Sequence, residues 1–146
     1  MADMKTLEPL LGRWQVQVRF PAGAPYGELT GELTCEWMLG GPYLSMSQSM
    51  EGVVPSSFSV VEADASGDGF TQHYYDTRGV TRLLAMTWEG GTWTLSRDKA
   101  DFSPLPFRQR YSGQMSDDGR TIEGAWHRTG DGEWLKDFDL THTRVG

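Results

Sequence analysis

The sequence predicts an all-β protein, a single up-and-down antiparallel β-barrel of about ten strands with a short N-terminal helix. After Gly12, apolar and polar residues alternate with a period of two along most of the chain, which is typical of strands with one buried face. Short turn sequences join these segments, and no crossover helix separates them. An open meander would leave two unpaired edges, and closure into a barrel removes both.

Length and charge narrow the class of protein. The 146 residues are one domain's worth, and we assign residues 1–146 to a single barrel domain. The formal net charge of −7 predicts no binding to nucleic acid or to anionic membranes. One cysteine, no apolar segment of signal-peptide length and no apolar run near the ~20 residues of a membrane helix favour a cytoplasmic protein.

The N-terminal residues are the one place where a helix is expected. Thr6 is the expected N-cap, and Leu7 and Leu10 supply apolar contacts. Pro9 is tolerated in a first turn, and Gly12 ends the helix. About two turns, partly 3₁₀, are predicted.

The strands follow from the alternation and from turn residues. The clearest pattern covers residues 28–37. There we expect four buried residues, Leu29, Leu33, Cys35 and Trp37, and three exposed ones, Glu28, Glu32 and Glu36. The ten expected strands are Arg13–Phe20, Glu28–Trp37, Tyr43–Met50, Phe58–Asp64, Phe70–Tyr75, Val80–Trp88, Thr92–Arg97, Phe107–Met115, Thr121–His127 and Trp134–Arg144.

Hairpin turns predict which side chains oppose one another. Glu89–Thr92 reads as a two-residue loop, which places Trp88 opposite Trp93. Across the turn Asp76–Gly79, Tyr75 should oppose Val80 and His73 should oppose Arg82. His73, Tyr75 and Arg82 would then point into the barrel together with Met86.

The predicted interior is aromatic and rich in methionine, with a few polar groups, as in small-molecule pockets. A barrel filled by its own side chains is the alternative. The candidate ligand-binding residues are His73, Tyr75, Arg82, Met86, Gln48, Gln109 and Tyr111.

Gly12-Arg13-Trp14, after a short helix, resembles the opening of lipocalins and the wider calycin superfamily. In lipocalins a late arginine packs over this tryptophan, so the resemblance implies that Trp14 and Arg144 close one end of the barrel. The whole chain is similar to a bacterial family of lipocalin-like barrels of unassigned function, with fatty-acid-binding proteins and nitrobindins as more distant relatives. The matching stretches are Leu7–Trp14, Glu36–Gly41, Tyr75–Gly79, Ser116–Trp126 and Phe138–Val145. This resemblance implies the fold and transfers no catalytic residues.

Binding of a small hydrophobic or aromatic ligand inside the barrel is the first functional hypothesis. The alternative is a cofactor-free isomerase, cyclase or lyase, in which His73, Tyr75 and Arg82 supply a base, an acid and an anion holder. Haem binding, as in nitrobindins, is a lesser alternative, because the Gly-x-Trp-x-Gly-x-Gly opening of those proteins is absent here. The scattered histidines and Cys35 lack zinc-site spacing, so neither a metal nor a cofactor is expected. A homodimer through an outer face of the barrel stays an open alternative.

The ligand mouth is expected at the barrel end opposite Trp14. Phe20 and the loops Pro21–Pro25, Gly52–Ser57, Asp76–Gly79 and Asp98–Pro106 would surround it. These loops include the longest connections in the sequence, and long loops on a rigid scaffold usually carry function.

Overall fold

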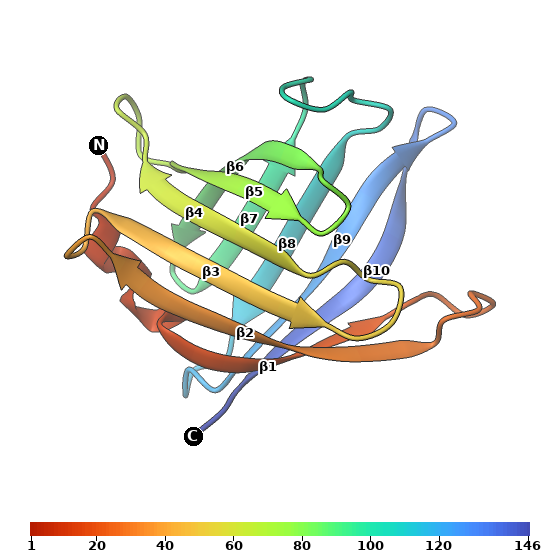
Figure 1. Ribbon diagram of the computed structural model, residues 1–146, viewed down its shortest axis with the longest axis horizontal. Helices are drawn as coiled ribbons and strands as arrows, with labels where there is room; N and C mark the ends of the chain where they lie inside the picture. Colours follow the sequence, from red (N-terminus) through yellow and green to blue (C-terminus); the bar gives the residue numbers. More distant parts are fainter.

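The computed structural model describes residues 1–146 as a closed antiparallel barrel of ten strands, which confirms the predicted fold class. Each strand pairs with its neighbours in sequence, and β1 also pairs with β10 (Figure 1). The elements are η1 (Met4–Leu10), β1 (Gly12–Arg19), β2 (Glu28–Met38), β3 (Tyr43–Met50), β4 (Ser57–Ala63), β5 (Phe70–Asp76), β6 (Thr81–Glu89), β7 (Thr92–Arg97), β8 (Gln109–Met115), β9 (Thr121–Gly130) and β10 (Glu133–Arg144).

The helix η1 is a 3₁₀-helix and begins earlier than predicted. Its N-cap is Asp3, whose side chain accepts a hydrogen bond from the Lys5 backbone N–H at 2.9 Å. Thr6, the predicted cap, lies within the helix and donates its hydroxyl to the Asp3 carbonyl. Leu7 and Leu10 are buried against the barrel. No helix in the structure is long and apolar enough to cross a bilayer.

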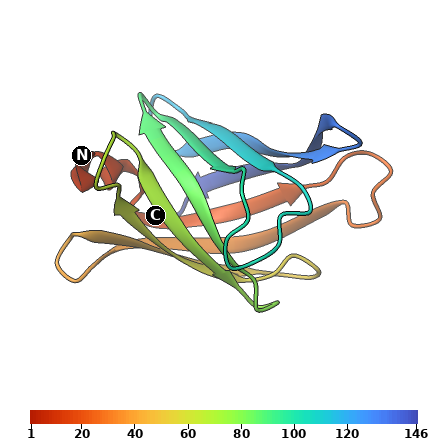
Figure 2. The same cartoon turned by 90° about the horizontal axis from the view of Figure 1, so that it is seen from above.

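Helix η1 lies at the barrel end opposite most of the long loops (Figures 1 and 2). Trp14 and Arg144 both contact the end of this helix. Trp14 is 1% exposed, and its indole Nε1 donates to the Leu10 carbonyl at 2.9 Å. The Cζ of Arg144 lies 4.1 Å from the centroid of the Trp14 ring. The same guanidinium donates to the carbonyls of Leu11 and Pro9, both at 2.6 Å. Helix η1 and the strands β1 and β10 are therefore joined around the Trp14 ring.

The alternation in β2 appears as predicted in its central part. Leu33 and Cys35 are buried, and Glu32 and Glu36 are exposed. Leu29 and Trp37, which were predicted to be buried, are only half-buried, because each lies near one end of the strand. Burial raises the pKa of the Cys35 thiol to about 12, which suits a packing role rather than a reactive one.

The β5–β6 hairpin differs from the predicted register by one residue. Asp76 opposes Val80, with its backbone N–H donating to the Val80 carbonyl at 3.1 Å, and Gly79 adopts a φ of +80°. Three residues rather than four therefore lie in the turn, because the left-handed glycine forms a bulge. Tyr74, not His73, consequently lies opposite Arg82.

Candidate functional site

A cavity of about 440 Å³ occupies the barrel and reaches the end opposite Trp14. The connections that follow β1, β3 and β5 each contribute lining residues at this end, among them Tyr26, Val54 and Arg78. Phe107 lines it just after the loop Asp98–Pro106, which itself contributes none. The end predicted for the mouth is therefore the end at which these loops border the cavity. Of 26 lining residues, 16 are hydrophobic, so an apolar molecular body suits the interior.

Five buried side-chain polar atoms in the protein have no hydrogen-bond partner, and all five belong to residues that line this cavity. Native proteins leave few buried polar atoms unpaired, because each costs about 1–3 kcal/mol. The residues that line this apolar space therefore carry hydrogen-bonding atoms that no other part of the protein pairs with. The five atoms are Gln72 Oε1, Arg82 Nε, Trp93 Nε1, Tyr111 OH and His142 Nδ1.

Trp93, Tyr111 and His142 form an aromatic cluster deep in the barrel. The ring centroid of Trp93 lies 5.2 Å from that of Tyr111 and 5.6 Å from that of His142. His142 in turn lies 6.4 Å from the buried Trp14 ring, which places the cluster next to the closed end. Burial lowers the pKa of His142 to about 4 and raises that of Tyr111 above its usual range. At neutral pH the cluster therefore offers uncharged donors and acceptors.

Two glycines make room for the Tyr111 ring. Gly113 on β8 and Gly124 on β9 oppose one another in the sheet. A Cβ at Gly113 would lie 2.2 Å from the Tyr111 hydroxyl oxygen, and one at Gly124 would lie 2.8 Å from the ring. The bare backbone at this pair thus allows the phenol to lie flat against the wall.

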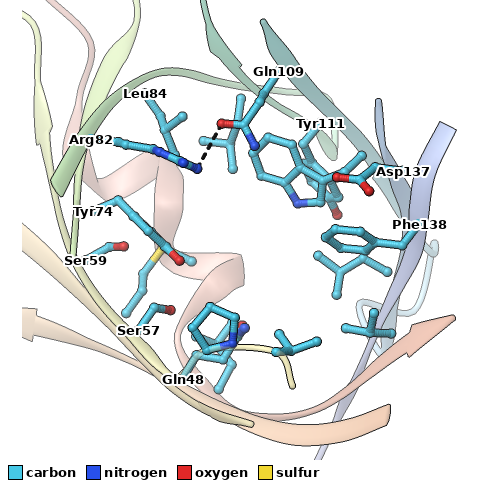
Figure 3. A pocket seen from close by; sticks show the side chains of 18 of the residues that line it. Gln48, Ser57, Ser59, Tyr74, Arg82, Leu84, Gln109, Tyr111, Asp137 and Phe138 are labelled. Carbon is cyan, nitrogen blue, oxygen red and sulfur yellow. Dashed lines mark hydrogen bonds between the residues drawn. The ribbon is translucent and has the colours of Figure 1, made fainter. Parts of the chain in front are cut away.

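Several polar side chains lie together on the cavity wall formed by β5, β6 and β8 (Figure 3). Arg82 Nη1 donates to Gln109 Oε1 at 3.2 Å. The Tyr74 hydroxyl donates to Asp76 Oδ2 at 2.8 Å, and Arg78 binds the same oxygen at 2.6 Å. Burial, followed by the hydrogen bond to Asp76, raises the pKa of Tyr74, so its phenol stays protonated.

Asp137 reaches the cavity because of a bulge in β10. The pairing with β9 shifts between Lys136 and Phe138, so Asp137 is an extra residue, and it lines the cavity together with Phe138. Burial raises the pKa of this carboxyl, and the Arg128 guanidinium, 3.8 Å away, opposes the rise.

Four of the predicted site residues, Gln48, Arg82, Gln109 and Tyr111, line the cavity. The prediction that His73 and Tyr75 point inward is wrong, because the one-residue change of register turns both to the outer face. His73 Nε2 lies 2.9 Å from Glu62 Oε1, and Tyr75 is 46% exposed. Met86 is buried but does not line the cavity.

Sequence reasoning missed Tyr74, Trp93, Asp137 and His142. For His142 a signal existed, since Leu140, His142 and Arg144 have a period of two. Once Arg144 is placed over Trp14, His142 must also face inward.

Protonation of His142 should make stability depend on pH. The folded pKa of about 4 is below the ordinary value of 6.5, so the unfolded chain binds a proton more readily. We expect the free energy of unfolding to fall as pH decreases from about 6.5 to 4, by on the order of 3 kcal/mol. Urea unfolding across this range would measure it in wild type and in His142→Gln, which should lose this part of the dependence.

His73→Gln is the matched control, because it removes a histidine from the outer wall. In this variant, the free energy of unfolding should still fall between pH 6.5 and 4 as it does in wild type, because His142 is unchanged. An unchanged pH slope in His142→Gln would contradict the prediction.

Comparisons with known proteins identify the fold and no family. No family model matches the chain, and no curated protein matches it. Among solved structures, it is similar to the crystal structure of Rv2717c from M. tuberculosis, with a TM-score of 0.72. The match covers 98% of this chain and 97% of that one at 14% sequence identity. The two proteins share a barrel fold.

Proposed function

We propose that this protein binds one small, mostly apolar or aromatic molecule with hydrogen-bonding groups inside the barrel. The observation that carries the proposal is that all five residues with unpaired buried polar atoms line one apolar cavity. The volume of this cavity, about 440 Å³, lies in the range of about 300–1,000 Å³ that is usual for ligand pockets.

The aromatic cluster would hold the inner part of such a ligand. Trp93 Nε1 is a donor, the Tyr111 hydroxyl can donate or accept, and neutral His142 offers one donor and one acceptor. Because ring faces and polar atoms meet here, the cluster favours a flat ring that carries an oxygen or nitrogen over a plain hydrocarbon chain.

The enzyme alternative in its original form does not fit this geometry, since His73 and Tyr75 lie on the outer face. Haem binding keeps one supporting observation, the unpaired Nδ1 of the cavity-lining His142. Titration with haemin would test it. A shift of the haemin Soret band that occurs in wild type and is absent in His142→Gln would support haem binding, and no shift in wild type would exclude it.

Titration with N-phenylnaphthylamine, a neutral probe that fluoresces in apolar surroundings, tests the proposed function. We expect saturable binding with one site per chain. Leu84→Trp places an indole in the cavity wall and should weaken binding at least about tenfold, a loss of about 1.4 kcal/mol.

The control is Ala85→Trp, which adds the same indole to the exposed outer face of β6. Its affinity should stay within about twofold of wild type. Absence of saturation in wild type, or equal losses in folded Leu84→Trp and Ala85→Trp, would overturn the proposal. Circular dichroism would confirm that both variants fold.

A further inference from the structure

Arg82 differs from the other charged side chains that line the cavity, because it has no ionic partner. Arg78 is paired with Asp76 at 2.6 Å, and Asp137 lies 3.8 Å from Arg128. Arg82 forms no salt bridge, and its one hydrogen bond goes to the neutral amide of Gln109. Its Nε is buried and has no partner at all.

The carboxylates near Arg82 are already committed to other cations. Asp76 accepts from Tyr74 and Arg78, and Asp101 binds Arg97 at 2.8 Å. Burial lowers the pKa of Arg82, the charges of Arg97 and Arg78 lower it further, and the charge of Asp76 offsets a part of this. An arginine still remains protonated in proteins, so a positive charge without an ion-pair partner lies in the cavity wall.

Gln109 extends this positive site by a second donor. Because a guanidinium can only donate, the Gln109 oxygen is turned toward Arg82, and the amide NH₂ remains free to donate. Figure 3 shows the two side chains side by side at one edge of the cavity. The Arg82 guanidinium and this NH₂ suit a planar or tetrahedral group with two or more acceptor oxygens.

We propose that the ligand is an organic anion whose carboxylate, sulfonate or sulfate group binds Arg82 and Gln109 while its aromatic body fills the cavity. This inference rests on the proposed function and adds the charge of the ligand to it. The protein carries a net charge of −7, so an anion is held by this local pair and not by the overall field.

Asp137 is the carboxylate that lines the cavity, and it would repel an anion placed next to it. Figure 3 shows Asp137 beside Phe138, on the opposite side of the cavity from Arg82. The acidic end of the ligand is thereby directed to the β6 side.

Two fluorescent probes with one shared body separate charge from apolar contact. Anilinonaphthalene sulfonate is N-phenylnaphthylamine with an added sulfonate. If Arg82 binds an anion, wild type should bind the sulfonate at least about tenfold more tightly than the neutral probe, although the neutral probe is the more hydrophobic. Equal or reversed affinities in wild type would overturn the inference without any variant.

Arg82→Gln should weaken binding of the sulfonate at least about tenfold more than it weakens binding of the neutral probe. Arg82→Lys keeps the charge and should retain most of the preference. Arg110→Gln removes the same charge from an exposed position on β8 and should change neither affinity.

The outcomes distinguish this inference from the proposed function. Binding of the neutral probe without preference for the sulfonate would overturn the anion site alone. Equal weakening of both probes by Arg82→Gln would show that Arg82 shapes the cavity instead of binding charge, and would also overturn it. Saturation by neither probe would remove the proposed function itself.

Discussion

Trp14→Ala should lower the free energy of unfolding by about 3–5 kcal/mol. The indole is 1% exposed and lies between η1, β1 and β10, so its loss leaves a cavity that the surrounding strands cannot close. The variant also loses the hydrogen bond from Nε1 to the Leu10 carbonyl and the ring beneath Arg144. Small domains are stable by only about 5–15 kcal/mol, so a large part of the total would disappear.

Urea unfolding would measure this loss, with Trp134→Ala as the control. Trp134 is half-buried, and Arg108 and Arg110 lie over its ring at 5.3 and 4.3 Å. Its removal should cost distinctly less, because this tryptophan does not belong to the barrel core. Equal losses in the two variants would show that Trp14 does not hold the closed end together.

Asp101→Asn should be destabilising by a similar amount, about 3–5 kcal/mol. Arg97 is 2% exposed, and Asp101 is its ionic partner at 2.8 Å. The carboxylate also accepts from the backbone N–H groups of Leu83 and Ser103. Hydrogen bonding from Arg97 holds the pKa of Asp101 well below its usual range. Asparagine keeps the shape but leaves the Arg97 charge buried without a counter-ion.

Asp98→Asn is the matched control for Asp101→Asn, since Asp98 lies three residues earlier and is also paired with an arginine. Asp98 and Arg108 are 2.8 Å apart, but both side chains are exposed. Surface pairs contribute about 0–1 kcal/mol, so this change should have little effect on urea unfolding. A loss in Asp101→Asn no larger than that in Asp98→Asn would contradict the prediction.

The strands were predictable because their signal is local. Alternating side chains point to opposite faces of any strand, so residues 28–37 show their buried and exposed faces without knowledge of the partner strands. The turn Glu89–Thr92 is equally local, since two adjacent glycines permit its positive φ values, and Trp88 does oppose Trp93. Closure followed from the same pattern, because an unclosed meander would expose two edges.

The site residues were harder to predict, because a shift of one residue exchanges the faces of a strand. Gly79 adopts a left-handed conformation and forms a bulge, which shifts the register of the β5–β6 hairpin by one residue. This shift puts Tyr74 in the cavity and His73 outside it. The inward position of Arg82 was predicted correctly, because alternation along its own strand places it on the same face as Leu84.

Local pattern was therefore sufficient for the ten strands and the apolar character of the interior, whereas the closed end at Trp14 and Arg144 was implied by the resemblance to lipocalins. Which polar and aromatic side chains meet in the cavity depends on pairing between strands. The bulge at Asp137 exists only relative to β9, and the cluster of Trp93, Tyr111 and His142 assembles from β7, β8 and β10. The missing counter-ion of Arg82 likewise depends on which carboxylates the folded chain has paired with Arg78 and Arg97. Contacts between residues distant in sequence are set by closure of the whole barrel, so no short stretch of sequence contains them.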